Sequence, residues 1–160
     1  MEVTKQVLSE SIKEKIKAEV SKYPSGEAAL LPALYIVQDD LGYISPESVD
    51  GISELLKIPS SKITGVSTFY SMFNNKPVGK YLLQLCTSIS CYLAGSDELF
   101  EYISKKLKIN AGETTPDGKF TLMKVECLAS CGTAPVLQIN NDYHENMTIE
   151  KVDELLKKLS

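Results

Sequence analysis

Four cysteines, arranged as two pairs, are the residues of this chain whose type and spacing can do chemistry. Cys86 and Cys91 form a C-x4-C pair, and Cys127 and Cys131 form a C-x3-C pair. Each pair follows an apolar run, at the point where small polar residues begin. If the fold brings the pairs together, they supply the two thiolates per iron that a [2Fe–2S] cluster requires. We therefore predict a [2Fe–2S] site made of these four thiolates.

The spacing alone leaves three other interpretations of the cysteines open. Structural zinc sites often have ligand pairs separated by about two to four residues, a range that includes both pairs. Two disulfides would require an oxidising compartment, and four unrelated buried thiols would not explain why both pairs follow predicted strands. The pattern differs from those of plant-type and bacterial ferredoxins. The only histidine, His144, excludes a two-histidine Rieske centre, and we interpret it as a solvated turn residue.

The elements that position the cysteines are predicted from the apolar pattern of the second half of the chain. They are a strand over 81–85, a helix over 92–108, strands over 120–126 and 136–139, and a last helix capped by Thr148. The order is therefore β-α-β-β-α. A strand, crossover helix and strand in one sheet make a parallel pair. We expect Cys86 and Cys127 to emerge at the same edge of that sheet.

The first half of the chain is predicted to be helical. Four helices are expected: over 3–23, over 25–41, from Ser45 and Pro46, and from Ser60 or Ser61. Gly42 should end the second helix, and Pro32 should kink it. Because Asn74 to Pro77 breaks the helical pattern, we expect two domains, a helical N-terminal region over 1–76 and a cluster domain over 77–160.

Composition and missing motifs exclude several classes of function. The net charge of −4 does not indicate the basic surface that is typical of nucleic-acid-binding proteins. The first 20 residues lack the apolar core of a signal peptide, and no apolar run is long enough to span a membrane. We therefore expect a cytoplasmic protein without direct membrane insertion. Neither a G-x-G-x-x-G nor a phosphate-binding G-x-x-x-x-G-K-[ST] motif occurs, and the C-x-x-C of dithiol oxidoreductases is absent.

Five segments in a fixed order carry a resemblance to a known family. They are residues 65–73 (GVSTFYSMF), 77–81 (PVGKY), the Cys86 to Cys91 pair, 112–120 (GETTPDGKF) and 125–136 (VECLASCGTAPV). Together they resemble the small [2Fe–2S] subunit of NADH:quinone oxidoreductase (complex I), from about Ser25 to the final helix. Related small subunits occur in NAD-linked hydrogenases and formate dehydrogenases, and the motifs do not choose among these assemblies.

The resemblance implies an α/β protein in which a helical N-terminal bundle precedes a thioredoxin-like [2Fe–2S] ferredoxin domain. It implies that Cys86, Cys91, Cys127 and Cys131 ligate one cluster. It also implies a partner, a larger flavoprotein subunit that binds FMN and NADH and carries a [4Fe–4S] cluster. The implied function is single-electron transfer beside the flavin of an NADH dehydrogenase complex, with no catalytic residue or substrate site in this chain. The alternatives are an assembly module stabilised by zinc and a free-standing [2Fe–2S] ferredoxin.

One departure from the family pattern lies inside the second cysteine pair. The family usually has Leu-Gly-Ala there, and this chain has Leu128-Ala129-Ser130. Losing the glycine restricts the backbone if φ is positive at that position. Ser130 adds a hydroxyl, and we expect the Ser90 and Ser130 hydroxyls to donate to cysteine sulfur. Ala134-Pro135 lies just before a strand, where thioredoxin-like domains often keep a cis-proline; the sequence is equally compatible with a trans bond.

Overall fold

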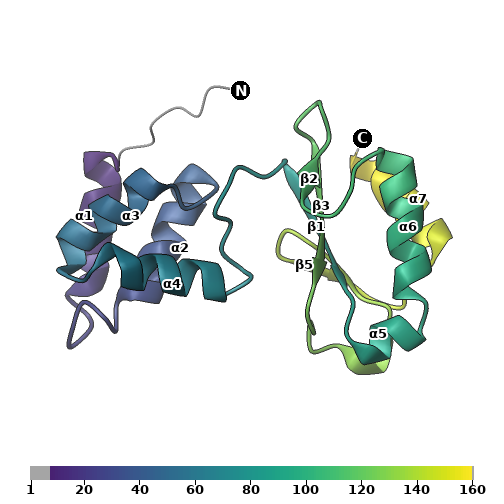
Figure 1. Ribbon diagram of the computed structural model, residues 1–160, viewed down its shortest axis with the longest axis horizontal. Coiled ribbons are helices and arrows are strands. Elements are labelled where there is room, and N and C mark those ends of the chain that lie inside the picture. Colours follow the sequence, from purple (N-terminus) through teal and green to yellow (C-terminus); the bar gives the residue numbers. More distant parts are fainter. Residues whose placement is uncertain (1–7, 160) are drawn as a thin grey trace. The chain divides into compact units, whose positions relative to one another are not determined.

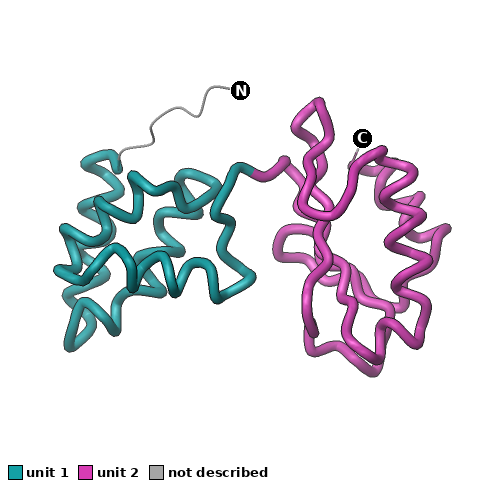
Figure 2. The backbone as a smooth tube through the Cα atoms, viewed as in Figure 1, with its two compact units in different colours: residues 1–77 teal, residues 78–160 magenta. Residues whose placement is uncertain are grey.

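The computed structural model describes residues 8–159. Its helices and strands are labelled in Figure 1. The chain divides into two compact units, residues 1–77 and 78–160, which are coloured separately in Figure 2. The part of the predicted first helix that precedes Leu8 lies outside the described residues.

The first unit contains four helices around one apolar core. They are α1 (Glu10–Val20), α2 (Leu30–Leu41), α3 (Pro46–Leu56) and α4 (Ser60–Phe69). Each helix contributes a fully buried aliphatic side chain, respectively Ile16, Leu34, Ile52 and Ile63. Ser45 caps α3 by accepting from the Ser48 amide at 3.1 Å. The periodic apolar residues therefore form the predicted helical region.

The start of the second helix was predicted wrongly. The chain turns over residues 25–29, and α2 begins only at Leu30. Gly26 packs so closely that a Cβ there would lie 2.2 Å from the Leu56 carbonyl oxygen. Pro32 falls in the first turn of α2, where no intrahelical amide is needed, and this removes the reason for the predicted kink. Gly42 ends α2 with a φ of 82°, as predicted.

The second unit is built on a five-stranded mixed sheet in the order β2-β3-β1-β4-β5. The strands are β1 (Tyr81–Cys86), β2 (Glu113–Thr114), β3 (Phe120–Val125), β4 (Leu137–Ile139) and β5 (Asp142–His144). The predicted parallel pairing of β1 with β3 is confirmed, and it places Cys86 opposite Val125. The short strands β2 and β5 were not predicted. His144 therefore lies in a strand, where we had placed it in a turn.

Three α-helices complete the second unit: α5 (Ile89–Leu93), α6 (Ser96–Leu107) and α7 (Ile149–Leu159). The single helix predicted over 92–108 is wrong, because Gly95 adopts a φ of 91° and separates α5 from α6. Helices α6 and α7 lie on the same side of the sheet (Figure 1). Their apolar stripes pack on the sheet around the fully buried residues Leu85 and Leu122.

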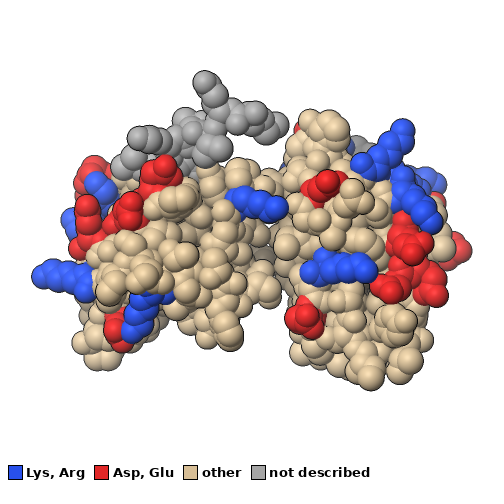
Figure 3. All heavy atoms as spheres, in the orientation of Figure 1, with Lys and Arg blue, Asp and Glu red and all other residues tan. Residues whose placement is uncertain are grey.

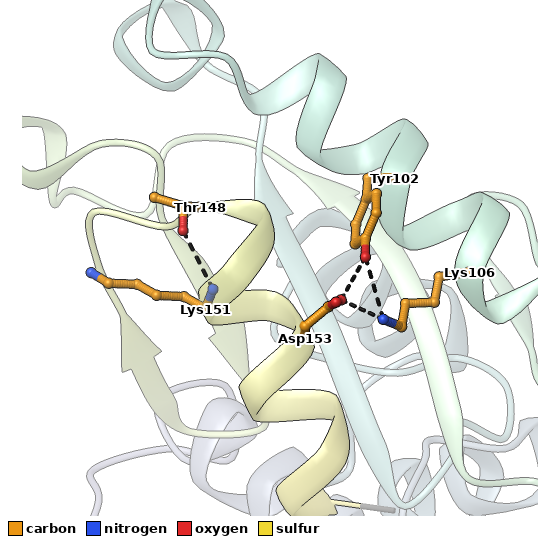
Figure 4. A network of polar contacts seen from close by, with 5 residues as sticks. All are labelled: Tyr102, Lys106, Thr148, Lys151 and Asp153. Carbon is orange, nitrogen blue, oxygen red and sulfur yellow. Dashed lines mark hydrogen bonds and ion pairs between the residues drawn. The ribbon is translucent and has the colours of Figure 1, made fainter.

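A polar network joins α6 to α7 at the edge of this core (Figure 4). The Tyr102 hydroxyl donates to the Asp153 carboxylate at 2.6 Å, and Lys106 forms an ion pair with the same carboxylate. The Lys106 ammonium also donates to the Tyr102 hydroxyl at 3.3 Å. The Thr148 hydroxyl accepts from the Lys151 amide at 3.3 Å, as expected of the residue that caps α7.

We predict that Asp153→Asn lowers the free energy of unfolding slightly at neutral pH and that this difference disappears in acid. Hydrogen bonds from Lys106 and Tyr102 hold the pKa of the Asp153 carboxyl below its usual range. A carboxylate with a lowered folded pKa stabilises the protein above its unfolded-state pKa, and this contribution is lost as the pH falls through the folded value. The effect is small because the ion pair is partly exposed and screened by salt.

Urea unfolding at several pH values tests this prediction. The wild type should lose more stability than Asp153→Asn on acidification below about pH 4. A difference between the two proteins that stays constant from about pH 7 to about pH 3 would contradict it.

Candidate metal centre

The parallel strands β1 and β3 bring the two cysteine pairs to one end of the sheet. Cys86 is the last residue of β1, and Cys127 follows β3 by two residues. The Thr87 amide donates to the Val125 carbonyl at 3.0 Å, so both loops leave the sheet together. Helix α5 and the 3-10 helix η1 (Cys131–Thr133) contact each other at this end, as Figure 1 shows. The sequence-based prediction that the pairs emerge at one edge is confirmed.

The four sulfurs form two close pairs. The Cys127 and Cys131 sulfurs lie 3.5 Å apart, and Cys86 lies close enough to Cys91 to raise the pKa of that thiol. Cys131 also lies near enough to Cys86 and Cys91 to interact with them electrostatically. All four are free thiols, which does not support the disulfide interpretation. Cys86 and Cys91 are each 2% exposed, whereas Cys127 and Cys131 are exposed to solvent.

Burial and crowding make two of the thiols, Cys91 and Cys131, hard to deprotonate. Burial raises the pKa of Cys91 to about 11, and the hydrogen bond with Cys86 acts in the same direction. The hydrogen bond with Cys127 and the charge of that side chain raise the pKa of Cys131. Bound metal cations reverse this balance, because they stabilise thiolates and displace their protons. The donor set therefore fits a metal centre that supplies positive charge among the sulfurs.

Hydrogen-bond donors surround the sulfurs, although not all those we predicted. The Ala129 amide donates to the Cys127 sulfur at 3.3 Å. Ser90 acts to lower the pKa of Cys131, and the Val136 backbone acts to lower that of Cys91, against the larger upward shifts. For Ser90 the hydrogen bond to sulfur stays a prediction. It is wrong for Ser130, whose hydroxyl is hydrogen-bonded to the Glu145 carboxylate.

The arrangement in pairs bears on the choice between zinc and a dinuclear cluster. A four-cysteine zinc site needs its ligands tetrahedrally around a single ion. A [2Fe–2S] cluster instead takes two thiolates on each of two irons. The two sulfur pairs of this chain suit the second arrangement.

Comparison with known proteins places the chain in a family. The family model described as thioredoxin-like [2Fe-2S] ferredoxin matches residues 16–160, nearly the whole chain. The chain belongs to the thioredoxin-like [2Fe–2S] ferredoxin family. It is 39% identical over 147 residues to an NADH-quinone oxidoreductase subunit (E 2) of Rhizobium meliloti, a match that covers 92% of this chain and 88% of that protein. NADH-quinone oxidoreductase subunit 2 of Thermus thermophilus is 44% identical over 142 residues, with 87% and 78% covered.

Solved structures agree with this family in fold. An NAD+-reducing [NiFe]-hydrogenase chain matches with a TM-score of 0.71 at 21% identity, covering 81% of this chain and 22% of that longer chain. The predicted α/β fold, a helical N-terminal region followed by a thioredoxin-like ferredoxin domain, is therefore confirmed. The cofactor that this ferredoxin family implies is a [2Fe–2S] cluster. The Ala134-Pro135 bond, which the sequence left undecided, is cis.

The departure inside the second pair has the backbone consequence that we considered. Ala129 adopts a φ of 61°, in the left-handed region where a Cβ is unfavourable by about 1–2 kcal/mol. We predict that Ala129→Gly raises the free energy of unfolding by up to about 1 kcal/mol, because glycine removes this strain but loses more chain entropy on folding. Denaturant unfolding of the cluster-loaded protein measures the change. A clear loss of stability would show that the Ala129 methyl makes a contact worth more than the strain.

Proposed function

We propose that the chain is the electron-transferring iron–sulfur subunit of an NADH:quinone oxidoreductase or of a related NAD-linked complex. The observation that carries this proposal is the meeting of two thiol pairs at one end of the sheet. The sequence relatives described above support the proposal, because they are subunits of NADH-quinone oxidoreductase and this chain covers most of their length.

Cys86, Cys91, Cys127 and Cys131 are the proposed ligands. When bound, a [2Fe–2S] cluster accepts and releases one electron at a time. The chain holds Cys86 and Cys91 in a dry environment and leaves Cys127 and Cys131 at the surface. Backbone and hydroxyl donors at the sulfurs offset the negative charge of four thiolates.

The proposed partner is a flavoprotein subunit that binds FMN and NADH and carries a [4Fe–4S] cluster. Three large apolar side chains on α5, beside Cys91, support a docking surface: Ile89, Tyr92 and Leu93 are 75%, 57% and 79% exposed. The face of this end drawn in Figure 3, at the lower right, consists mainly of uncharged residues. A contiguous group of exposed apolar side chains is typical of a surface that a partner covers.

We propose that the assembled protein lies in the cytoplasm and is attached to the membrane only through the other subunits of its complex. None of the helices within residues 8–159 has the length and apolar character needed to cross a bilayer. The sequence relatives are NADH-quinone oxidoreductase subunits, whereas the hydrogenase is similar at only 21% identity and so shows the fold alone. We therefore favour NADH:quinone oxidoreductase over a hydrogenase as the parent complex.

Anaerobic purification of the tagged chain from its native cells tests this function. We expect a flavoprotein to co-purify, and NADH alone to produce the EPR signal of a reduced [2Fe–2S] cluster. Recovery of the cluster-loaded chain without flavin would contradict the proposal and favour a free-standing ferredoxin. Recovery with hydrogenase subunits would assign the chain to the other assembly.

A further inference from the structure

A carboxylate from a distant part of the chain contacts the loop that carries Cys127 and Cys131. Glu145 directly follows β5, and its Oε1 accepts a hydrogen bond from the Thr133 hydroxyl at 2.7 Å. The Ser130 hydroxyl is bonded to the same oxygen, and the two hydroxyls lie 2.8 Å apart. One carboxylate oxygen thus holds two hydroxyls that flank Cys131.

The backbone around Glu145 is fixed by the fold, so the carboxylate is held in place. The Asn146 amide donates to the Thr133 carbonyl at 2.7 Å, and the Met147 amide donates to the Pro135 carbonyl at 3.0 Å. The Lys151 ammonium, on α7, donates to the Glu145 and Asn146 carbonyl oxygens at 3.3 and 2.8 Å. Met147 itself is buried in the core of the unit. This segment therefore fastens the cysteine loop to α7 and to the core.

The loop has reason to need such support. It contains only one 3-10 turn, both of its cysteines are exposed, and Ala129 adopts an unfavourable left-handed conformation.

The contact of Glu145 with Ser130 and Thr133 also places a charge near the cysteines. Hydrogen bonds from Ser130 and Thr133 keep the pKa of Glu145 below its usual range, so the group is anionic at neutral pH. A fixed negative charge beside a cluster opposes the arrival of an electron.

We propose that Glu145 is a positioning residue for the cluster, which holds the Cys127–Cys131 loop in its binding conformation and lowers the reduction potential through its charge. This inference rests on the proposed ligation of a [2Fe–2S] cluster by the four cysteines. Glu145 touches Ser130 and Thr133, not the sulfurs, and acts through the loop. The effect of the carboxylate therefore has two separable parts, one geometric and one electrostatic.

Two substitutions separate these parts in the full chain loaded with its cluster. Glu145→Ala removes the acceptor and the charge, so we expect cluster loss to a chelator to become about tenfold faster, the equivalent of one charge-assisted hydrogen bond. Glu145→Gln keeps an oxygen acceptor and removes the charge. It should lose its cluster within about threefold of the wild-type rate, but with a midpoint potential shifted to more positive values.

Matched controls use Glu154, an exposed glutamate of α7. Glu154→Ala and Glu154→Gln should leave both the rate of cluster loss and the midpoint potential unchanged. Ser130→Ala is a further test variant: it removes one of the two hydroxyls bonded to Glu145 and should accelerate cluster loss. A Glu145→Ala chain that loses its cluster at the wild-type rate overturns the positioning role. A Glu145→Gln chain with the wild-type potential overturns the electrostatic role. A wild-type chain that assembles no cluster is a different result, because it overturns the proposed function itself.

Discussion

Replacing Cys91 by alanine is expected to abolish the [2Fe–2S] cluster. Cys91 is 2% exposed and lies close to Cys86, so its removal would leave the proposed cluster with three of its four protein thiolates. The buried apolar neighbours of Cys91 are Cys86 and Val136, with Leu128 and Ala134 packed against them. The anaerobically prepared variant should show almost no visible chromophore and no EPR signal after dithionite reduction.

Two further variants show whether the loss is due to ligation. Cys91→Ser keeps an oxygen ligand of similar size and should retain a reduced amount of cluster with altered EPR parameters. Tyr92→Phe, at the next position of α5, should bind cluster as the wild type does. If Cys91→Ala assembled a normal amount of cluster with an unchanged EPR signal, Cys91 would not be a ligand.

Truncating Leu85 to alanine is expected to cause the largest loss of stability in the second unit. Leu85 is fully buried on the central strand β1, opposite Leu137 of β4, and belongs to the core under α6 and α7. Removing a buried leucine side chain loses its transfer free energy and leaves a cavity, which together amount to about 3–5 kcal/mol. We expect a decrease of that size in the free energy of unfolding, measured by denaturant titration.

Leu93→Ala is the matched control, because it makes the same chemical change at a side chain that is 79% exposed. Its effect should stay within about 0.5 kcal/mol. Equal losses for the two variants would mean that burial in this sheet does not determine the stability of the unit.

The long elements could be predicted from sequence because their apolar periods are strong, and the short ones could not. The six-residue strands β1 and β3 and the capped helices α3 and α7 follow the predictions closely. Strands β2 and β5 have two and three residues, too few to show alternation. The break between α5 and α6 depends on the positive φ of Gly95, which an isolated glycine in a helical pattern does not specify.

The meeting of the four cysteines at one end of the sheet could be predicted from sequence, and the contact that supports their loop could not. Cysteine type and spacing identify the four thiols, and the parallel strands explain why they meet. Ala129 adopts a left-handed backbone conformation, which the sequence could raise only as a conditional case. Glu145, by contrast, follows a three-residue strand that was not predicted and belongs to no motif. Only the tertiary fold brings this carboxylate to Ser130, so no local pattern could have revealed it.

The central claim is that one [2Fe–2S] cluster is held by the four cysteines of this chain. Iron and acid-labile sulfide analysis of the anaerobically purified protein, with EPR after dithionite reduction, tests it most directly. We expect about two irons and two sulfides per chain and a rhombic signal of spin one-half from the reduced protein. Stoichiometric zinc in protein from native cells, with no visible chromophore, would contradict the claim and leave a structural metal site in its place.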